Sequence, residues 1–341
     1  MGVRLGAIGV GGLGYLQLDI YDGLPEIDIV AAADVSAEAR ALFTTEFDAP
    51  AYETHREMLA EHLDELDAAT IITPHALHYD QAKACLERGL HVLVEKPMVT
   101  DVGHAIELCE IAEQNDLVLQ VGYQRHFHPA FREIRRILKS GRIGEIHMVS
   151  CHLGQDWIRP HQNNWRMNPD LSGGGQLYDT GSHLLDALLW TTGARPTSVV
   201  SQIEFRKPRI DINSALSIQL EADGESILAS VGVTGNGVSL DPWEGFYYWG
   251  TRGRLTYAED TITVAEKDAM TYATEITTGV DFRTLTARKT RNFVDAIEGR
   301  AASKVPGEYG LTVTALTEAA YMAADSIEPI SVPDLIEEYH G

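Results

Sequence analysis

A glycine-rich turn between an apolar run and a helical stretch opens the chain. Val3–Ile8 is an apolar run of the kind found in parallel strands that are covered on both faces. Gly9-Val10-Gly11-Gly12-Leu13-Gly14 follows it directly, with G-x-G-x-x-G spacing, and leads into the helical pattern of Leu13–Tyr21. A strand, this turn and a helix in succession predict the first unit of an open α/β sheet.

The glycines of this turn fit a phosphate-binding role. Gly9 would allow a tight turn, Gly11 a close approach to a pyrophosphate, and Gly14 close packing of helix on strand. Gly12 and Leu13 begin the helix, whose free N–H groups and positive dipole end attract an anion. The alternative is an ordinary strand-to-helix turn, but its place in the strand-turn-helix pattern favours a dinucleotide site.

Asp34 ends the second apolar run, twenty residues after Gly14. An acid at this position suits the two hydroxyls of an adenosine ribose and would repel a 2′-phosphate. Val35 and Ser36 offer no cation, and Arg40 lies more than a turn into the next helix. The sequence therefore favours NAD over NADP.

The first third of the chain alternates between short apolar runs and helical stretches, which predicts a doubly wound parallel sheet. The expected strands are Val3–Ile8, Ile29–Ala33, Ala69–Thr73, Val92–Val94 and Leu117–Val121. The expected helices between them are Leu13–Tyr21, Ala37–Phe47, His75–Arg88 and Val102–Asn115. Thr54 and Glu57 have the spacing of a capping box.

After Gly122 the pattern changes to longer strand-like stretches with few helices, which predicts an α+β domain with a large, mostly antiparallel open sheet. The expected strands are Ile146–Leu153, Thr197–Phe205, Ala215–Glu221, Ser226–Thr234 and Phe246–Thr251, and the expected helices are Pro129–Ser140, Tyr178–Thr191, Leu285–Glu298 and Gly310–Ala324. A chain of 341 residues exceeds what one core usually supports. We therefore expect a dinucleotide-binding domain at 1–122 and an α+β domain at 123–341.

Charge and apolar patterning exclude several classes of protein. The formal net charge is −23, from 50 acidic and 27 basic residues, which disfavours binding to nucleic acid or to anionic membranes. Adaptation to high salt is our hypothesis for this excess. There is neither a membrane-spanning apolar run nor a signal-peptide pattern, so we expect a cytoplasmic protein. Cys85, Cys109 and Cys151 lack metal-ligand or redox spacing.

Several motifs in order along the chain resemble the glucose-fructose oxidoreductase, inositol dehydrogenase and rhizopine-catabolism family. They are the opening glycine turn, Thr73-Pro74 with His78, the stretch 87–97 ending in Glu95-Lys96-Pro97, Gly122-Tyr123-Gln124-Arg125, and Gly174-Gly175 followed by Asp179-Thr180-Gly181-Ser182-His183. The resemblance implies a dinucleotide domain, a second domain whose open sheet often forms the interface of a homodimer or homotetramer, and catalysis by Lys, Asp and His. It also implies that Thr73, Pro74, His75, His78, Glu95 and Lys96 contact the cofactor. His75 stands where relatives often have Asn.

Lys96, Asp179 and His183 suit the chemistry of alcohol oxidation. A base must accept the hydroxyl proton while hydride leaves the carbon, and a His can serve as that base or as the acid of the reverse reaction. Asp179 and His183 are four apart on a predicted helix, so the carboxylate could orient the imidazole. Lys96, after the fifth strand, would stabilise negative charge on the reacting oxygen. The glycines 173–175 would let a substrate approach closely.

Candidate substrate contacts fall in two segments. Trp157, Trp165 and Arg166, with Arg159 and Asn164 nearby, could bind a sugar ring and its hydroxyls or a carboxylate, or the tryptophans could simply pack their own loop. Tyr123, Gln124 and Arg125 follow the sixth strand, at the ligand edge, although Arg125 could form a structural ion pair. His126 and His128 have no carboxylate near them in sequence, and we predict no metal site.

The sequence thus predicts an NAD-dependent oxidoreductase of a sugar, polyol or sugar acid. Two alternatives remain open. One is an elimination or glycoside cleavage that uses tightly bound NAD for transient oxidation. The other is a protein that senses NAD or a sugar without turnover, although a sensor would have no need of the Lys, Asp and His set.

Overall fold

The fold was analysed in a computed structural model that describes residues 2–207, 209–267, 272–275 and 280–340. The chain forms two compact units, one of residues 1–124 with 280–311 and one of residues 125–279 with 312–341. Residues 280–311, which the sequence placed in the expected second domain of 123–341, pack within the first unit. The physical reason is packing: Phe293 and Val294 lie in the same apolar core as Leu5 and Leu18.

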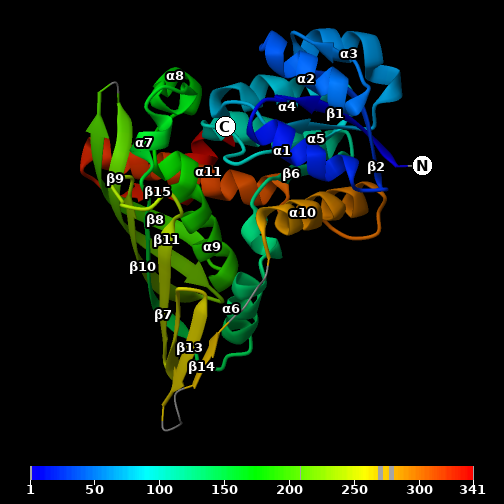
Figure 1. The fold of residues 1–341 in the computed structure, drawn as a ribbon. Helices are drawn as coiled ribbons and strands as arrows, with labels where there is room; N and C mark the ends of the chain where they lie inside the picture. The colour runs from blue at the N-terminus through cyan, green and yellow to red at the C-terminus, as the bar shows by residue number, and fades with distance from the viewer. Residues whose placement is uncertain (1, 208, 268–271, 276–279, 341) are drawn as a thin grey trace. The chain divides into compact units, whose positions relative to one another are not determined.

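The first unit is built on a six-stranded parallel sheet with the order β3-β2-β1-β4-β5-β6 (Figure 1). Its strands are β1 (Val3–Ile8), β2 (Ile27–Ala33), β3 (Ala51–Tyr52), β4 (Ala68–Ile71), β5 (His91–Val94) and β6 (Leu119–Val121). Its helices are α1 (Leu13–Asp22), α2 (Ala37–Phe47), α3 (His55–His62), α4 (His78–Leu86), α5 (Val102–Gln114) and α10 (Phe282–Ile297). The doubly wound fold expected from the alternating pattern is confirmed.

Local signals explain where several of these helices begin. The capping box is present at α3: Thr54 Oγ1 accepts from the Glu57 N–H, and the Glu57 carboxylate accepts from the Thr54 N–H, both at 3.2 Å. Ser36 caps α2 and Asp101 caps α5 in the same way, each accepting from an N–H three residues on. These caps fix the residue at which each helix begins. They therefore also fix where the turn between a strand and the next helix lies.

The second unit is built on a nine-stranded sheet with the order β14-β13-β12-β11-β7-β10-β9-β8-β15. Neighbouring strands are antiparallel except β7 and β10, which are parallel. The strands are β7 (Ile146–Gly154), β8 (Arg195–Arg206), β9 (Ile210–Ala222), β10 (Glu225–Thr234), β11 (Trp243–Gly250), β12 (Gly253–Ala258), β13 (Thr261–Glu266), β14 (Tyr272–Glu275) and β15 (Ile330–Ser331). The other α-helices in the part of the chain that the structure describes are α6 (Pro129–Lys139), α7 (Ile158–His161), α8 (Pro169–Ser172), α9 (Ser182–Thr192), α11 (Gly307–Ser326) and α12 (Val332–His340).

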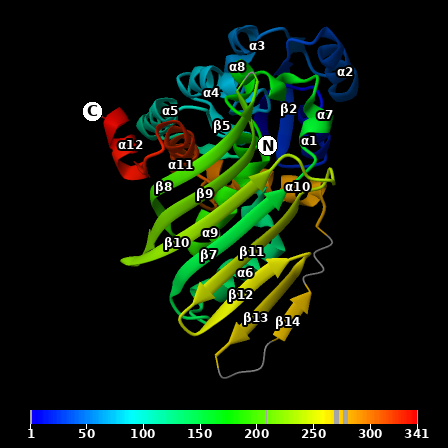
Figure 2. The ribbon, with the colours of Figure 1, turned by 90° about the vertical axis from the view of Figure 1, so that its left-hand side faces the viewer.

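One face of this sheet is covered by helices that include α6 and α9, and the other face is open over its middle strands (Figure 2). The alternation along β9 reflects this, since Leu216 and Ile218 are buried while Ala215 and Ser217 are exposed. The mostly antiparallel open sheet expected from the sequence is confirmed. Strands β12 to β14 were not foreseen because they are short and rich in polar residues. Within the described part of the chain, no helix combines the length and apolar character needed to cross a bilayer.

Candidate active site

The carboxyl ends of the parallel strands in the first unit bring the predicted cofactor residues to one edge. The glycine turn follows β1, Asp34 follows β2, Thr73 follows β4, Lys96 follows β5 and Tyr123 follows β6. Residues that are far apart in sequence therefore share the edge at which open α/β sheets bind ligands.

The glycine turn needs glycine for two reasons. Gly9 has a φ of +86°, and a Cβ there would lie 2.5 Å from the carbonyl oxygen of Ile72. A Cβ on Gly14 would collide with the carbonyl oxygen of Gly9, so helix and strand approach as closely as predicted. Gly12 has a φ of +50° and faces open space, and the first turn of α1 carries no acidic residue. These features fit a site for the pyrophosphate of a dinucleotide.

The carboxylate of Asp34 is held at this turn by main-chain donors. Its Oδ2 accepts from the N–H groups of Val10 at 2.8 Å and Gly11 at 3.1 Å, and its Oδ1 accepts from that of Ser36 at 2.8 Å. The guanidinium of Arg40 donates to the carbonyl oxygens of Asp34 at 2.7 Å and Val35 at 3.1 Å. Arg40 therefore supports the Asp34 turn from the main-chain side.

The Thr73 turn and the Lys96 turn are joined by His78. This side chain is fully buried, with Nδ1 2.9 Å from the Pro97 carbonyl oxygen and Nε2 2.9 Å from that of Thr73. Burial lowers the pKa of His78, although both carbonyls oppose the shift. The Thr73 hydroxyl donates to Gln81 at 2.6 Å, and the peptide between Lys96 and Pro97 is cis. His78, predicted as a cofactor contact, thus contacts both turns from the protein side.

Other predicted residues of this edge differ in exposure. Tyr123 and His75 are buried, whereas Glu95 and Lys96 are partly exposed. Thr73, Pro74 and Gln124 are also partly exposed. The partly exposed side chains are those that the sheet edge presents to solvent, so they are the better placed to meet a ligand.

In the second unit, Asp179 and His183 stand on two different kinds of helix. Asp179 lies in a π-helix, Leu177–Gly181, and His183 lies in the first turn of α9. The sequence predicted one regular helix through both residues. A π-helical turn inside or beside an α-helix is often found at functional sites.

The carboxylate of Asp179 is fixed by two side-chain donors. Its Oδ2 accepts from the indole Nε1 of Trp157 and from Nε of Arg166, both at 2.8 Å. The Arg166 guanidinium also lies over the ring of Trp165, 4.4 Å from its centroid. Trp157 is 1% exposed and Asp179 is 5% exposed, so the indole contact is shielded from water. Of the predicted substrate residues, Trp157 and Arg166 therefore hold the predicted catalytic carboxylate.

The space beside the two glycines before this π-helix is occupied by other residues of the protein. A Cβ on Gly174 would lie 2.5 Å from the Tyr178 ring and would collide with the Tyr321 hydroxyl. A Cβ on Gly175 would lie 2.8 Å from the main-chain nitrogen of Asp211 and closer still to its carbonyl oxygen. The expectation that residues 173–175 leave room for a substrate is therefore wrong for Gly174 and Gly175, which are buried because other residues pack against them.

Asp211 was not identified from the sequence, yet it anchors this turn. Its carboxylate accepts from the N–H groups of Gly175 and of Leu177, the latter at 2.7 Å, and from the Tyr321 hydroxyl. Burial raises the pKa of Asp211, while these donors oppose the shift. The contact spans 110 residues between Asp211 and Tyr321. No local sequence signal predicts a contact of that range.

Arg125 and His126 support α9 from a neighbouring segment. Arg125 donates to the His183 carbonyl oxygen at 3.0 Å and forms an ion pair with Glu244. Of the two roles left open for Arg125, these contacts favour the structural ion pair. His126 lies 2.7 Å from the Asp186 carboxylate, and both side chains are fully buried. His126 thus has a carboxylate beside it in the fold, although none stands near it in the sequence.

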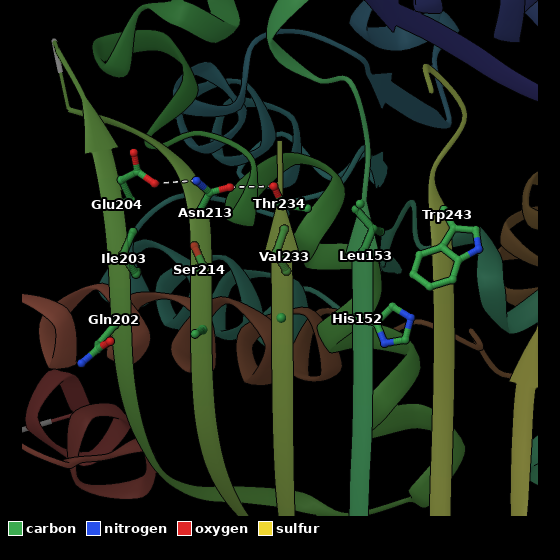
Figure 3. A pocket seen from close by; sticks show the side chains of 13 residues that line it. His152, Leu153, Gln202, Ile203, Glu204, Asn213, Ser214, Val233, Thr234 and Trp243 are labelled. Carbon is green, nitrogen blue, oxygen red and sulfur yellow. Dashed lines mark hydrogen bonds between the residues drawn. The ribbon is translucent and has the colours of Figure 1, made fainter. Parts of the chain in front are cut away.

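The open face of the second unit's sheet carries a depression of about 820 Å³ over β7 to β11 (Figure 3). Glu204, Asn213 and Thr234 form a hydrogen-bonded row along one end of it, with contacts of 2.5 and 2.6 Å. His152 stacks on Trp243, with ring centroids 4.7 Å apart. Across the described residues, we find no group of three His, Cys, Asp or Glu side chains arranged to hold a metal ion.

Comparison with known proteins places the chain among oxidoreductases. A family described as "Oxidoreductase family, NAD-binding Rossmann fold" matches residues 3–123, and "GFO/IDH/MocA C-terminal domain" matches residues 131–256. Rhizopine catabolism protein MocA of Rhizobium meliloti is 30% identical over 233 residues, which cover 67% of this chain and 71% of MocA.

Two further similarities concern sugar enzymes. D-xylose 1-dehydrogenase [NADP(+)] of Haloarcula marismortui is 31% identical over 170 residues, 49% of this chain and 46% of that protein. For seven curated relatives other than MocA, the matched segment spans 38% to 58% of their length. The structure of levoglucosan dehydrogenase with NADH and levoglucosan matches with a TM-score of 0.87 at 20% identity, over 98% of this chain and 100% of that one. At this identity the match shows the shared fold alone.

Proposed function

The chain belongs to the Gfo/Idh/MocA family of NAD(P)-dependent oxidoreductases, and we propose on this premise that it is an NAD-dependent dehydrogenase of a sugar or polyol. The observation that carries the proposal is the fixed carboxylate of Asp179, four residues before His183. Taking a carboxylate out of water costs free energy that its pairing with an indole and a guanidinium returns only in part, which favours a use of its charge by a nearby group. The family's sugar-dehydrogenase members support the choice of substrate class.

The proposed chemistry divides between three side chains. A bound nicotinamide would supply the acceptor for hydride from the alcohol carbon. His183 would accept the hydroxyl proton, because an imidazole can gain or lose a proton near neutral pH. Lys96 would stabilise the negative charge that develops on the same oxygen. Asp179 would favour the protonated form of His183, with Trp157 and Arg166 keeping its carboxylate in place.

The proposed cofactor is NAD. The Asp34 carboxylate stands at the glycine turn, where it would accept from ribose hydroxyls and repel a 2′-phosphate. Arg40, the nearest candidate for binding such a phosphate, already donates to two carbonyl oxygens.

A panel of sugars, polyols and sugar acids, with NAD or NADP, tests the proposal through absorbance of the reduced cofactor. Because of the acidic excess, each assay would be run in dilute buffer and in molar KCl. Lys96→Met should lower turnover by about 10²–10³, and His183→Asn by about 10²–10⁴, while both retain NAD binding. Lys139→Met, which removes an exposed lysine of α6, is the matched control. Full turnover in Lys96→Met would overturn the assignment.

The same panel separates the two alternative functions. An enzyme that uses NAD for transient oxidation would convert a glycoside without accumulating NADH. A sensor would bind NAD or a sugar with no conversion at all. Accumulation of NADH in step with an oxidised sugar supports the dehydrogenase and excludes both.

We also propose that the open sheet face pairs with a second copy of the chain. Val200, Met148 and Leu228 expose 42%, 37% and 50% of their surface on this face, around small residues that would let another sheet approach. Gly232→Arg, in the depression of Figure 3, should convert a dimer or tetramer to a smaller species in light scattering. A wild-type monomer would contradict the proposal.

A further inference from the structure

Helix α10 places a lysine inside the first unit. Lys289 is 1% exposed, and its ammonium donates to the Glu95 carboxylate at 2.5 Å and to Gln17 Oε1 at 3.0 Å. Gln17 in turn donates to Glu95 Oε1 at 2.8 Å, and the Tyr21 hydroxyl donates to Gln17 Oε1 at 2.7 Å. Lys289, Gln17 and Glu95 therefore form a closed ring of hydrogen bonds, and the Tyr21 hydroxyl joins it at Gln17.

An ammonium in this position is unfavourable unless its partner is always charged. Lys289 lies four residues from Leu285 and from Phe293, both buried, so it occupies an apolar face of α10. An apolar side chain there would join the same core without the desolvation of a charge. Packing therefore does not explain why a lysine stands here, and the reason must lie in what Lys289 does to the charge of Glu95.

Glu95 is also confined on its other side. Its carboxylate fills the space over Gly122, where a Cβ would lie 2.9 Å from the carboxylate atoms. Its main-chain N–H donates to the Ile71 carbonyl oxygen at 2.9 Å. The Lys289 network thus fixes the side chain, and the sheet fixes the backbone, of the residue that immediately precedes Lys96.

We propose that Lys289 is a positioning residue, which keeps Glu95 ionised and in place so that the Glu95-Lys96 turn is set for cofactor and substrate. This inference rests on the proposed function for its effect on turnover, but its effect on cofactor binding does not depend on the identity of the sugar. The ligand concerned is the nicotinamide half of the dinucleotide, whose ribose hydroxyls can donate to a carboxylate.

The charges around Glu95 give the proposal a pH signature. Burial on its own would raise the pKa of Glu95, but Lys289 from α10, Gln17 from α1 and the adjacent Lys96 lower it. His78 from α4 also interacts with this carboxylate, and Tyr21 faces Lys289. Without the Lys289 ammonium, burial is opposed by fewer groups, so the pKa of Glu95 rises and the carboxylate protonates at a higher pH.

The experiment measures NAD binding by calorimetry between pH 5 and 8 in the full chain. In Lys289→Met we expect affinity within about threefold of wild type at pH 8 and a loss of tenfold or more at pH 5.5, where wild type changes little. The double variant Lys289→Met/Glu95→Gln removes both charges, keeps the shape and should bind NAD with no such pH dependence. Arg291→Met, which removes an exposed guanidinium two residues along α10, is the matched control and should follow wild type.

Turnover provides the second readout. With any sugar that the wild type oxidises, Lys289→Met should lose tenfold or more in kcat at pH 8, and Lys289→Arg should recover part of the loss. A Lys289→Met variant that melts earlier yet keeps the wild-type pH profile of NAD binding would overturn the proposal. If no sugar is oxidised by the wild type, the dehydrogenase assignment fails, while the binding profile still decides the role of Lys289.

Discussion

A methyl group at Gly175 should destabilise the second unit without acting on substrate binding. The Cβ of Gly175→Ala would meet the main chain of Asp211, which belongs to β9 and is paired with β8, so it cannot rotate away. Overpacking of this kind costs up to about 3 kcal/mol, and more when a backbone must shift. A change of ~1 kcal/mol lowers Tm by roughly 2–4 °C in a unit of this size, so we expect a fall of roughly 6–12 °C.

Calorimetry and steady-state kinetics on the same preparation test this reasoning. Gly23→Ala is the matched control, because Gly23 has a φ of −77° and a Cβ there meets its nearest atom, the Ile20 carbonyl oxygen, at 3.5 Å. The folded fraction of Gly175→Ala should keep its sugar KM, since the glycine faces Asp211 and not a ligand. A variant with wild-type Tm and a strongly raised KM would refute this account and restore the role that the sequence suggested for the turn.

Three further predictions concern the residues around Asp179 and those at the strand ends of the first unit. Trp157→Phe removes one donor from the Asp179 carboxylate, worth about 1.5–3 kcal/mol, so kcat should fall tenfold or more with NAD affinity unchanged; an unchanged kcat would show that the indole does not support catalysis. Asp34→Ser removes a charge whose repulsion of a 2′-phosphate is worth about 1–2 kcal/mol at a partly exposed site, so the ratio of kcat/KM for NADP over NAD should rise about tenfold, and a constant ratio would contradict the assigned role. Burial lowers the pKa of His78 in the folded state, so its stabilising contribution is present above the unfolded pKa of about 6.5 and is lost as pH falls through the lowered folded value; Tm should therefore fall less between pH 7.5 and 5 in His78→Gln than in wild type, and equal slopes would exclude this linkage.

Features set by neighbours in sequence were predictable. The strand-to-helix alternation, the capping box at Thr54 and the glycine turn each depend on residues within one turn or one strand. The same holds for the separate roles of Gly9 and Gly14, which follow from the close approach of a helix to the strand before it. The family motifs then extended the prediction to the whole chain, because their order along the sequence is specific to the family.

Features set by long-range contacts were not predictable. The sequence gives no sign that Trp157 would donate to Asp179, or that Asp211 and Tyr321 would fill the space around Gly174 and Gly175. The π-helical turn at Asp179 also escapes a reading based on a period of 3.6 residues. The buried network around Glu95 does have a sequence signal, because Lys289 stands between Leu285 and Phe293 and interrupts an apolar face of the helix.

The central claim is that hydride moves between an alcohol carbon of a sugar and the nicotinamide. The most direct measurement uses a substrate from the panel that carries deuterium at the oxidised carbon, with mass spectrometry of the reduced cofactor. We predict deuterated NADH in equal amount to the oxidised sugar, and almost none with Lys96→Met or His183→Asn. Reduced cofactor without deuterium, or sugar conversion without reduced cofactor, would contradict the account.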